Sequence, residues 1–249
     1  MTSTLHSNTL KAIVTEDFRA AMVFEKYSLD FCCNGGVTID QACATRKVDP
    51  AVVLSELDRL LGTPPPSGTR TEEWETEALI DHILAVHHEY VRTAIPVLSL
   101  HTEKVARVHG ERHPEVITIA QHFARVAGEL QHHMMKEERI LFPYIRALAV
   151  ARREGTRPET PHFGSAANPI MMMEAEHAAA GDTLYAVRSL SNNYTVPQDA
   201  CTTYQVTYQE LRQFEEDLHR HVHLENNILF PSAIALEQSL GMMNAVSHS

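Results

Sequence analysis

Two stretches of the chain share the string H-x-x-x-E-x-x-I-L-F-P, in which a histidine precedes a glutamate by four residues. The first holds His133 and Glu137, and the second holds His221 and Glu225. Residues four apart lie on one face of an α-helix, so each helix presents an imidazole and a carboxylate together. Such ligands suit iron or manganese inside helical bundles, where a carboxylate can bridge two metals. One pair alone also occurs as an ordinary surface contact, but its recurrence favours a two-metal site.

The remaining ligands must come from other helices. His177 is the only histidine of its segment, whereas the segment before the first string offers His82, His87, His88 and His101. His109 lies about 31 Å beyond His88 along a straight helix, so the two cannot share one metal pair unless that helix breaks. Most of the 16 histidines are expected to be ordinary surface or core residues. This group includes His82, His87, His101, His122, His132, His219 and His223.

Helices must position these side chains. Apolar residues recur at helical spacing in four long segments, and we find no alternating strand pattern. The segments span about 71–108, about 114–153, about 167–191 and about 198–240. The connections between them are mostly short and rich in Gly, Pro, Ser, Thr and Asn, which predicts an all-α, up-down-up-down four-helix bundle. Pro96 is expected to kink or end the first helix, and the shared I-L-F-P ending to serve packing and helix termination.

The N-terminal part is expected to form a separate small helical domain over residues 1–61, with three or so short helices. Three consecutive prolines in the segment 62–70 predict a semi-rigid linker, which leaves residues 71–249 for the bundle. Cys32 and Cys33 precede an Asn-Gly-Gly turn, after which Thr38 or Asp40 is available as a helix cap.

Composition limits the class of protein. A chain of 249 residues with 44% hydrophobic residues can bury a substantial core. Its net charge of −11 argues against sequence-independent nucleic-acid binding, which depends on Lys and Arg. No apolar run approaches the roughly 20 residues that span a bilayer, and no signal peptide is evident. With only 4 cysteines, two of them adjacent, we expect a cytoplasmic protein that does not contact a membrane.

Several longer strings resemble one family in order along nearly the whole chain. They are KYSLDFCCNGGVTIDQAC, HHMMKEERILFP, MMMEAEH, ACTTY and HVHLENNILFP. They resemble the di-iron iron–sulfur cluster repair proteins, also called repair of iron centres proteins, whose C-terminal domain is hemerythrin-like. The resemblance implies two non-haem irons bridged by two glutamates and an oxo-type group. The ligands that it implies here are His88, His133, Glu137, His177, His221 and Glu225, with His87 as an alternative to His88.

The resemblance extends to residues around the site. Glu129 and Glu176 match family carboxylates that would orient an imidazole or line an access path, although either also fits a solvated surface residue. His109 matches a family histidine and becomes a further candidate ligand if the first helix is broken. Cys32 and Cys33 are interpreted as redox-active thiols, contacts for an acceptor cluster, or small residues at a turn.

The resemblance also implies a function. Family members act under nitrosative and oxidative stress and restore damaged iron–sulfur clusters, and iron donation from the di-iron centre is the expected route. The partners would be damaged iron–sulfur proteins, with nitric oxide or oxygen as small ligands, and a homodimer fits as well. One alternative is a cytoplasmic protein that binds or reduces nitric oxide. Another is a hemerythrin-type oxygen carrier or sensor, which would give the cysteine-containing domain no role.

Overall fold

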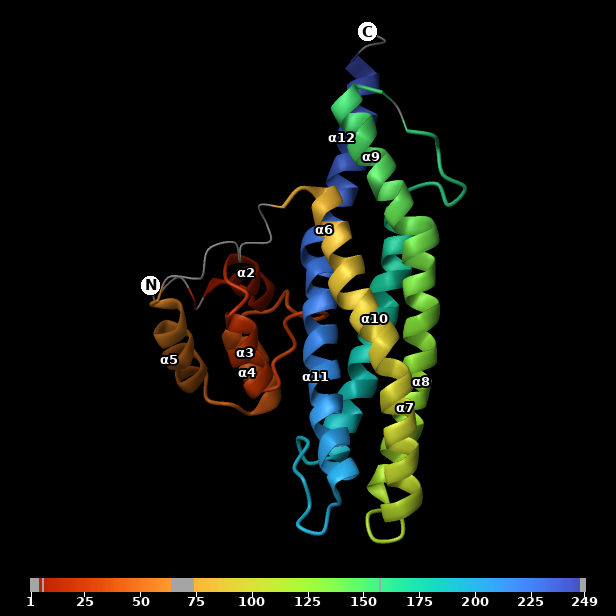
Figure 1. The fold of residues 1–249 in the computed structure, drawn as a ribbon. Coiled ribbons are helices and arrows are strands. Elements are labelled where there is room, and N and C mark those ends of the chain that lie inside the picture. The colour runs from red at the N-terminus through yellow and green to blue at the C-terminus, as the bar shows by residue number, and fades with distance from the viewer. Residues whose placement is uncertain (1–4, 6, 64–73, 157, 247–249) are drawn as a thin grey trace.

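The computed structural model describes residue 5 and residues 7–63, 74–156 and 158–246. Figure 1 shows a small helical domain beside a long bundle of helices. In the described ranges every named element is a helix, and the only β contact is an isolated bridge between Thr9 and Thr38. The predicted all-α fold is therefore confirmed. None of the described helices combines the length and apolar composition needed to cross a bilayer.

The N-terminal domain contains four described helices, where the sequence predicted three or so. They are α2 (Leu10–Glu16), α3 (Ala20–Lys26), α4 (Ile39–Arg46) and α5 (Pro50–Leu61). Thr38, rather than Asp40, caps α4: its side chain accepts from the Gln41 N–H, while the Gln41 side chain accepts from the Thr38 N–H. This capping box satisfies two N–H groups and fixes where the helix begins after the cysteine-containing loop.

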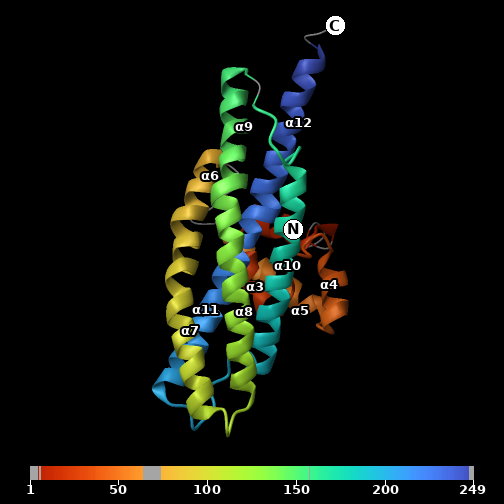
Figure 2. The same ribbon diagram turned by 90° about the vertical axis from the view of Figure 1, so that its right-hand side faces the viewer.

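Four rods form the bundle. They are α6 (Thr76–His82), η2 (Ile83–His88) and α7 (Glu89–His109); α8 (Glu115–Lys136), η3 (Glu137–Leu141) and α9 (Phe142–Glu154); α10 (Ala167–Leu190); and α11 (Thr202–Leu224), η4 (Glu225–Leu229) and α12 (Phe230–Val246). Contacts of α7 with α8, α8 with α10, α10 with α11 and α11 with α7 close a four-membered ring. Figures 1 and 2 show the rods running alongside one another in this order.

Three of the rods contain a π-helical turn, and the turns η3 and η4 begin at Glu137 and Glu225. The expectation that I-L-F-P ends each helix is wrong, because α9 and α12 continue beyond Pro143 and Pro231. Each proline is the second residue of the α-helix that follows the π turn. The π turn before it accommodates the proline, because its i to i+5 hydrogen bonds, such as that from the Phe142 N–H to the Glu137 carbonyl, already interrupt the regular α-helical pattern at this point of the rod.

Pro96 likewise does not end its helix, since α7 runs from Glu89 to His109 with Pro96 inside. Pro96 and Arg92, whose carbonyl loses its usual N–H partner, are both exposed. Water can therefore bond to the freed carbonyl, while Ile95 and Leu98 remain buried on the opposite face.

The N-terminal domain packs against the bundle, and buried residues of both parts belong to one apolar cluster, for example Phe31 and Val222. Figure 2 shows the domain against α10 and α11. Arg188 of α10 donates to the Glu25 carbonyl and to the Ser28 hydroxyl, both at 3.2 Å. These contacts hold the loop of residues 28–34 against the bundle. The predicted linker at 62–70 lies largely outside the described residues.

Candidate metal centre

Six buried side chains meet in the bundle core and form two overlapping groups. In each group, potential ligand atoms of all four residues lie within 4.8 Å of one another. Position A denotes the group His88, Glu137, His221 and Glu225, and position B denotes the group His133, Glu137, His177 and Glu225. All six side chains are at most 2% exposed. These six are the residues that the family resemblance implied as ligands, and the structure brings all of them together.

Each glutamate directs one oxygen toward each position. Glu137 Oε2 lies 3.4 Å from His88 Nε2 at position A, and its Oε1 lies 3.3 Å from His133 Nε2 at position B. Glu225 Oε1 lies 3.0 Å from His221 Nε2 at position A, and its Oε2 lies 3.1 Å from His177 Nε2 at position B. Two carboxylates placed in this way could bridge a pair of metal ions.

Several polar atoms of the cluster are buried without a hydrogen-bond partner. They include both carboxylate oxygens of Glu137, Oε2 of Glu225 and Nε2 of His88. Buried polar atoms are costly unless something satisfies them, and lone pairs that converge on one place are satisfied by cations. The donor set of imidazole nitrogens and carboxylate oxygens fits two iron ions, and the cluster could therefore bind a di-iron centre.

The pKa shifts within the cluster also fit a site that binds cations. Burial lowers the pKa of the His133 imidazole, but the charges of Glu137 and Glu225 outweigh it and raise that pKa to about 9. Burial raises the pKa of Glu225, yet His221 and His177 bring it well below its ordinary value. The pKa of Glu137 is lowered as well, since His133 and His88 outweigh the effect of burial, so the surroundings favour the carboxylate form of both glutamates.

Three of the four histidines donate a hydrogen bond from the ring nitrogen that faces away from the cluster. The Nδ1–H groups of His88 and His133 donate to Glu138 Oε1 at 2.9 Å and to Glu176 Oε2 at 2.8 Å. That of His177 donates to Asn226 Oδ1 at 2.8 Å. A donor at Nδ1 leaves the Nε2 lone pair free to bind a metal, so these contacts select the binding tautomer. His221 differs, because its Nδ1 is buried and has no partner.

The choice between the adjacent histidines His87 and His88 is resolved by their contacts. His88 Nε2 faces both glutamates, whereas His87 Nδ1–H donates to Asp217 Oδ1 at 2.9 Å and the His87 ring stacks on His221 at 5.5 Å. Within the described residues, positions A and B also contain none of the other histidines that were expected to be ordinary surface or core residues.

His109 does not join the centre. The helix break that this would need is absent from the described rod, since η2 and α7 run without interruption from Ile83 to His109. His109 lies at the end of α7, where its Nε2 is 3.2 Å from Cys201 Sγ. The continuous helix therefore overturns His109 as an additional ligand.

Glu129 and Glu176 take different roles. Glu176 accepts from the His133 imidazole and pairs with Lys136, so it orients a candidate ligand. The Glu129 side chain is 53% exposed and reaches only Arg125, at 4.0 Å. Both glutamates line a cavity of about 420 Å³ that borders His133 between α8 and α10.

Two further contact residues, Glu138 and Asn226, escaped the sequence analysis. Each directly follows one of the bridging glutamates, Glu137 or Glu225, and each accepts from a cluster histidine. The sequence signal that could have indicated them is their position next to those glutamates. That signal is useful only when the π turns are known, because these turns bring consecutive residues to one side of the cluster.

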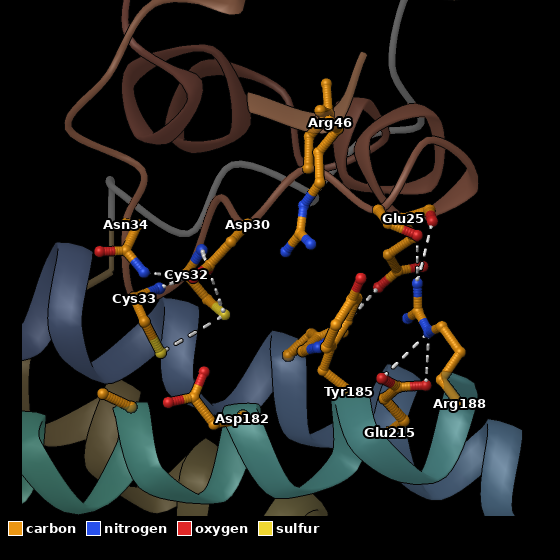
Figure 3. Close-up of a pocket in the computed structure, with 15 residues that line it drawn as sticks. Glu25, Asp30, Cys32, Cys33, Asn34, Arg46, Asp182, Tyr185, Arg188 and Glu215 are labelled. Atoms are coloured by element: carbon orange, nitrogen blue, oxygen red, sulfur yellow. Dashed lines mark hydrogen bonds and ion pairs between the residues drawn. The ribbon is translucent and has the colours of Figure 1, made fainter. Parts of the chain in front are cut away.

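Cys32 and Cys33 lie at the domain interface, outside positions A and B. Their sulfur atoms are 3.8 Å apart, and the Asp30 carboxylate accepts from both backbone N–H groups. The hydrogen bond with Cys33, then burial, raises the pKa of the Cys32 thiol well above its ordinary value. Figure 3 shows both sulfurs in a cavity of about 280 Å³ between the N-terminal domain and α10, near Asp182.

Comparison with known proteins agrees with this architecture. The hemerythrin HHE cation binding domain matches residues 79–233, and the family ScdA_N, described as a domain of unknown function, matches residues 6–61. The iron–sulfur cluster repair protein YtfE of Cronobacter sakazakii is 38% identical over 223 residues, which cover 88% of this chain and 93% of that protein. The chain belongs to the family of hemerythrin-like iron–sulfur cluster repair proteins.

Further members of the family give the same picture. The YtfE proteins of Citrobacter koseri and Enterobacter sp. are each 36% identical over 222 residues, which cover 88% of this chain and 93% of each relative. The hemerythrin match includes all six residues of positions A and B, and the ScdA_N match includes Cys32 and Cys33. The family membership inferred from the sequence strings is therefore confirmed.

Proposed function

We propose that this protein holds two iron ions at positions A and B and repairs damaged iron–sulfur clusters in the cytoplasm by giving up iron. The relatives are iron–sulfur cluster repair proteins by name. The observation that carries the proposal is the pair of shared glutamates, each of which directs one oxygen to each position. When bound, the two ions would supply transferable iron.

The residues of the cluster suit storage followed by release. They are four imidazoles and two carboxylates, without a thiolate. Protonation of an imidazole frees its metal, which makes such a site sensitive to proton supply. Position B borders a cavity through His133, and Glu176 and Lys136 are among the polar residues that line this cavity.

Isotope transfer tests the proposal. The protein is loaded with ⁵⁷Fe and mixed with a dehydratase whose [4Fe–4S] cluster has lost one iron by oxidation, in the presence of a reductant. Mössbauer spectroscopy of the re-isolated dehydratase should show ⁵⁷Fe in its cluster, and its activity should return. Recovery with no label, or label left entirely on the donor, contradicts donation. A Glu225→Ala variant, which should not hold two irons, serves as the control.

The cysteine pair belongs to the same proposal as a contact for the acceptor. Both thiols face a cavity at the surface of the domain interface, beside Asp30. Replacing Cys32 and Cys33 by Ser should lower the rate of cluster repair and leave the iron content of the bundle unchanged. An unchanged repair rate removes the pair from the mechanism.

Nitric oxide binding is a second candidate, favoured by one observation. The cavity beside His133 is lined in part by Leu130, Ala175, Ala179 and Ala180, and an apolar lining admits a small neutral gas. Titration of the reduced, iron-loaded protein with nitric oxide should then give iron–nitrosyl spectra. Formation of nitrous oxide would identify a reductase, and the absence of both signals excludes this candidate.

A further inference from the structure

Two consecutive asparagines in η4 reach from the bundle to the N-terminal domain. Asn226 Nδ2 donates to the Cys32 carbonyl at 3.3 Å, and Asn227 Nδ2 donates to the Phe31 carbonyl at 3.5 Å. Both side chains are half-buried. They therefore attach the backbone of the cysteine loop, at adjacent residues, to the π turn that begins with Glu225.

The second contact of each amide is different. Asn226 Oδ1 accepts from the Nδ1–H of His177 at 2.8 Å, whereas the second contact of Asn227 is made by the same Nδ2, which lies 3.0 Å from Nδ1 of His223. His177 belongs to position B, and His223 belongs to neither position. Of these two asparagines, only Asn226 links the cysteine loop to a candidate metal ligand.

The hydrogen bonds from the Cys32 carbonyl through Asn226 to His177 allow only one assignment of donors and acceptors. The Cys32 carbonyl can only accept, so the NH₂ group of Asn226 faces it and Oδ1 faces His177. An imidazole opposite Oδ1 must donate from Nδ1, which leaves the lone pair on Nε2 for position B. The docked loop thus fixes the orientation of an amide, and the amide fixes the tautomer of a ligand.

Hydrogen bonds to Asp30 connect the residues of the cysteine loop, so that a displacement of one residue affects the others. Asp30 accepts from the N–H groups of Cys32 and Cys33 and from the Asn34 side chain. One carboxylate therefore ties together the backbone of both cysteines and the Asn34 side chain. A change at either thiol, such as contact with an acceptor, reaches the Cys32 carbonyl directly.

We propose that Asn226 is a positioning residue that couples docking of the cysteine loop to retention of iron at position B. The inference rests on the proposed di-iron centre. Docking favours the binding tautomer of His177, and a metal on Nε2 in turn fixes the ring that holds Asn226, so each event stabilises the other to the same extent. Displacement of the loop releases iron from position B first.

Among the described residues, position A has no equivalent link to the N-terminal domain. His88 donates to Glu138, which accepts from Arg92 within the bundle, and the Nδ1 of His221 is without a partner. Movement of the N-terminal domain therefore acts on one of the two irons. The proposal predicts two unequal rates of iron loss in the wild-type protein.

Three variants of the full chain test the coupling. Asn226→Leu removes both hydrogen bonds. Asn226→Asp keeps an acceptor for His177 but places an oxygen against the Cys32 carbonyl, so it breaks only the link to the loop. Asn227→Leu is the matched control, since it also removes a bond to the loop but touches no candidate ligand.

Two measurements on protein loaded with ⁵⁷Fe read the outcome. The first is the rate at which a ferrous chelator removes each iron, together with the Mössbauer spectrum of the iron that remains. In Asn226→Leu one iron per chain should leave about 10 to 100 times faster, as expected for loss of a contact that orients a ligand. In Asn227→Leu the rate should stay close to that of the wild type.

The second measurement is hydrogen–deuterium exchange at residues 28–34, with and without iron. Iron should slow exchange in the wild type and in Asn227→Leu, but not in Asn226→Asp. Equal iron loss in Asn226→Leu and Asn227→Leu, or iron-dependent protection that persists in Asn226→Asp, overturns the coupling. Neither readout involves an acceptor cluster, so failure of this coupling is distinguishable from failure of iron donation. A wild-type protein that does not bind two irons refutes the di-iron centre itself.

Discussion

Positions A and B share two glutamates but differ in their surroundings. At position A, His88 is bonded to Glu138 of the bundle, and His221 is covered by the ring of His87. At position B, His133 is bonded to Glu176 beside a cavity, and His177 is bonded to Asn226. The same donor types are thus enclosed on one side and connected to the surface and the second domain on the other.

The difference shows how a nearly symmetric string can give unequal sites. The two copies of H-x-x-x-E-x-x-I-L-F-P supply equivalent pairs, His133 with Glu137 and His221 with Glu225. The difference between the positions comes from the residues that surround these pairs and form hydrogen bonds with the histidines. We therefore expect position A to retain iron and position B to exchange it.

Loss of a shared glutamate should have the largest effect, because it removes an oxygen from both positions at once. Glu225→Ala should reduce the iron content from two ions per chain to nearly none, as measured by inductively coupled plasma mass spectrometry. Glu174→Ala, which changes an exposed glutamate of α10, is the control and should keep both ions. Two ions in Glu225→Ala would rule out Glu225 as a bridge.

Loss of one histidine should affect one position. His221→Ala should empty position A and His177→Ala should empty position B, and each variant should keep about one iron because both glutamates remain. Iron analysis gives the number, and electron paramagnetic resonance distinguishes an isolated ion from a coupled pair. If each variant loses both ions, the two positions bind only as a unit and the comparison fails.

The sequence predicted most of the fold and the cluster for identifiable reasons. Apolar spacing defined the four rods, and the repeated string placed His133 with Glu137 and His221 with Glu225 on common helix faces. These inferences need only local periodicity, which survives without knowledge of neighbouring helices. His177 was the only histidine of its segment, and family resemblance then supplied His88.

The π turns were the main feature that the sequence concealed. A turn with hydrogen bonds from i to i+5 shifts the helical phase, so faces cannot be counted across it, and the residues alone left His87 and His88 open. The same turns allow Pro143 and Pro231 inside continuous rods, although the I-L-F-P ending predicts that a helix ends there. Asn226 could not be inferred, because its partner is a backbone carbonyl in another domain.

Removal of the acceptors beyond the histidines should have a smaller, position-specific effect. Glu176→Gln weakens the hydrogen bond to His133 at position B, and Glu138→Gln weakens the bond to His88 at position A. Each should lower metal affinity at its own position by about 10- to 100-fold. Chelator competition followed by Mössbauer spectroscopy identifies the iron affected. Identical spectral changes in both variants would show that the two positions do not have separate outer contacts.

The smallest expected effect concerns Asp30, which organises the loop attached to position B. Burial raises the pKa of Asp30, but hydrogen bonds from the Cys33 N–H and from Asn34 outweigh it and bring the pKa below its ordinary value of 3.8. The carboxylate therefore stabilises the folded loop above pH 3.8, and this contribution is lost as the pH falls through the lowered pKa. Asp30→Asn should lower the free energy of loop opening by about 1 to 2 kcal/mol at pH 7.

Hydrogen–deuterium exchange of residues 32–34 measures that free energy across the pH range. Asp182→Asn, which changes a carboxylate of α10 in the same cavity, is the control and should leave exchange in the loop unchanged. The difference between the wild type and Asp30→Asn should shrink as the Asp30 carboxylate becomes protonated. If Asp30→Asn opens the loop without faster iron loss at position B, then the loop moves independently of His177, and the inequality of the two positions must come from the cavity beside His133 alone.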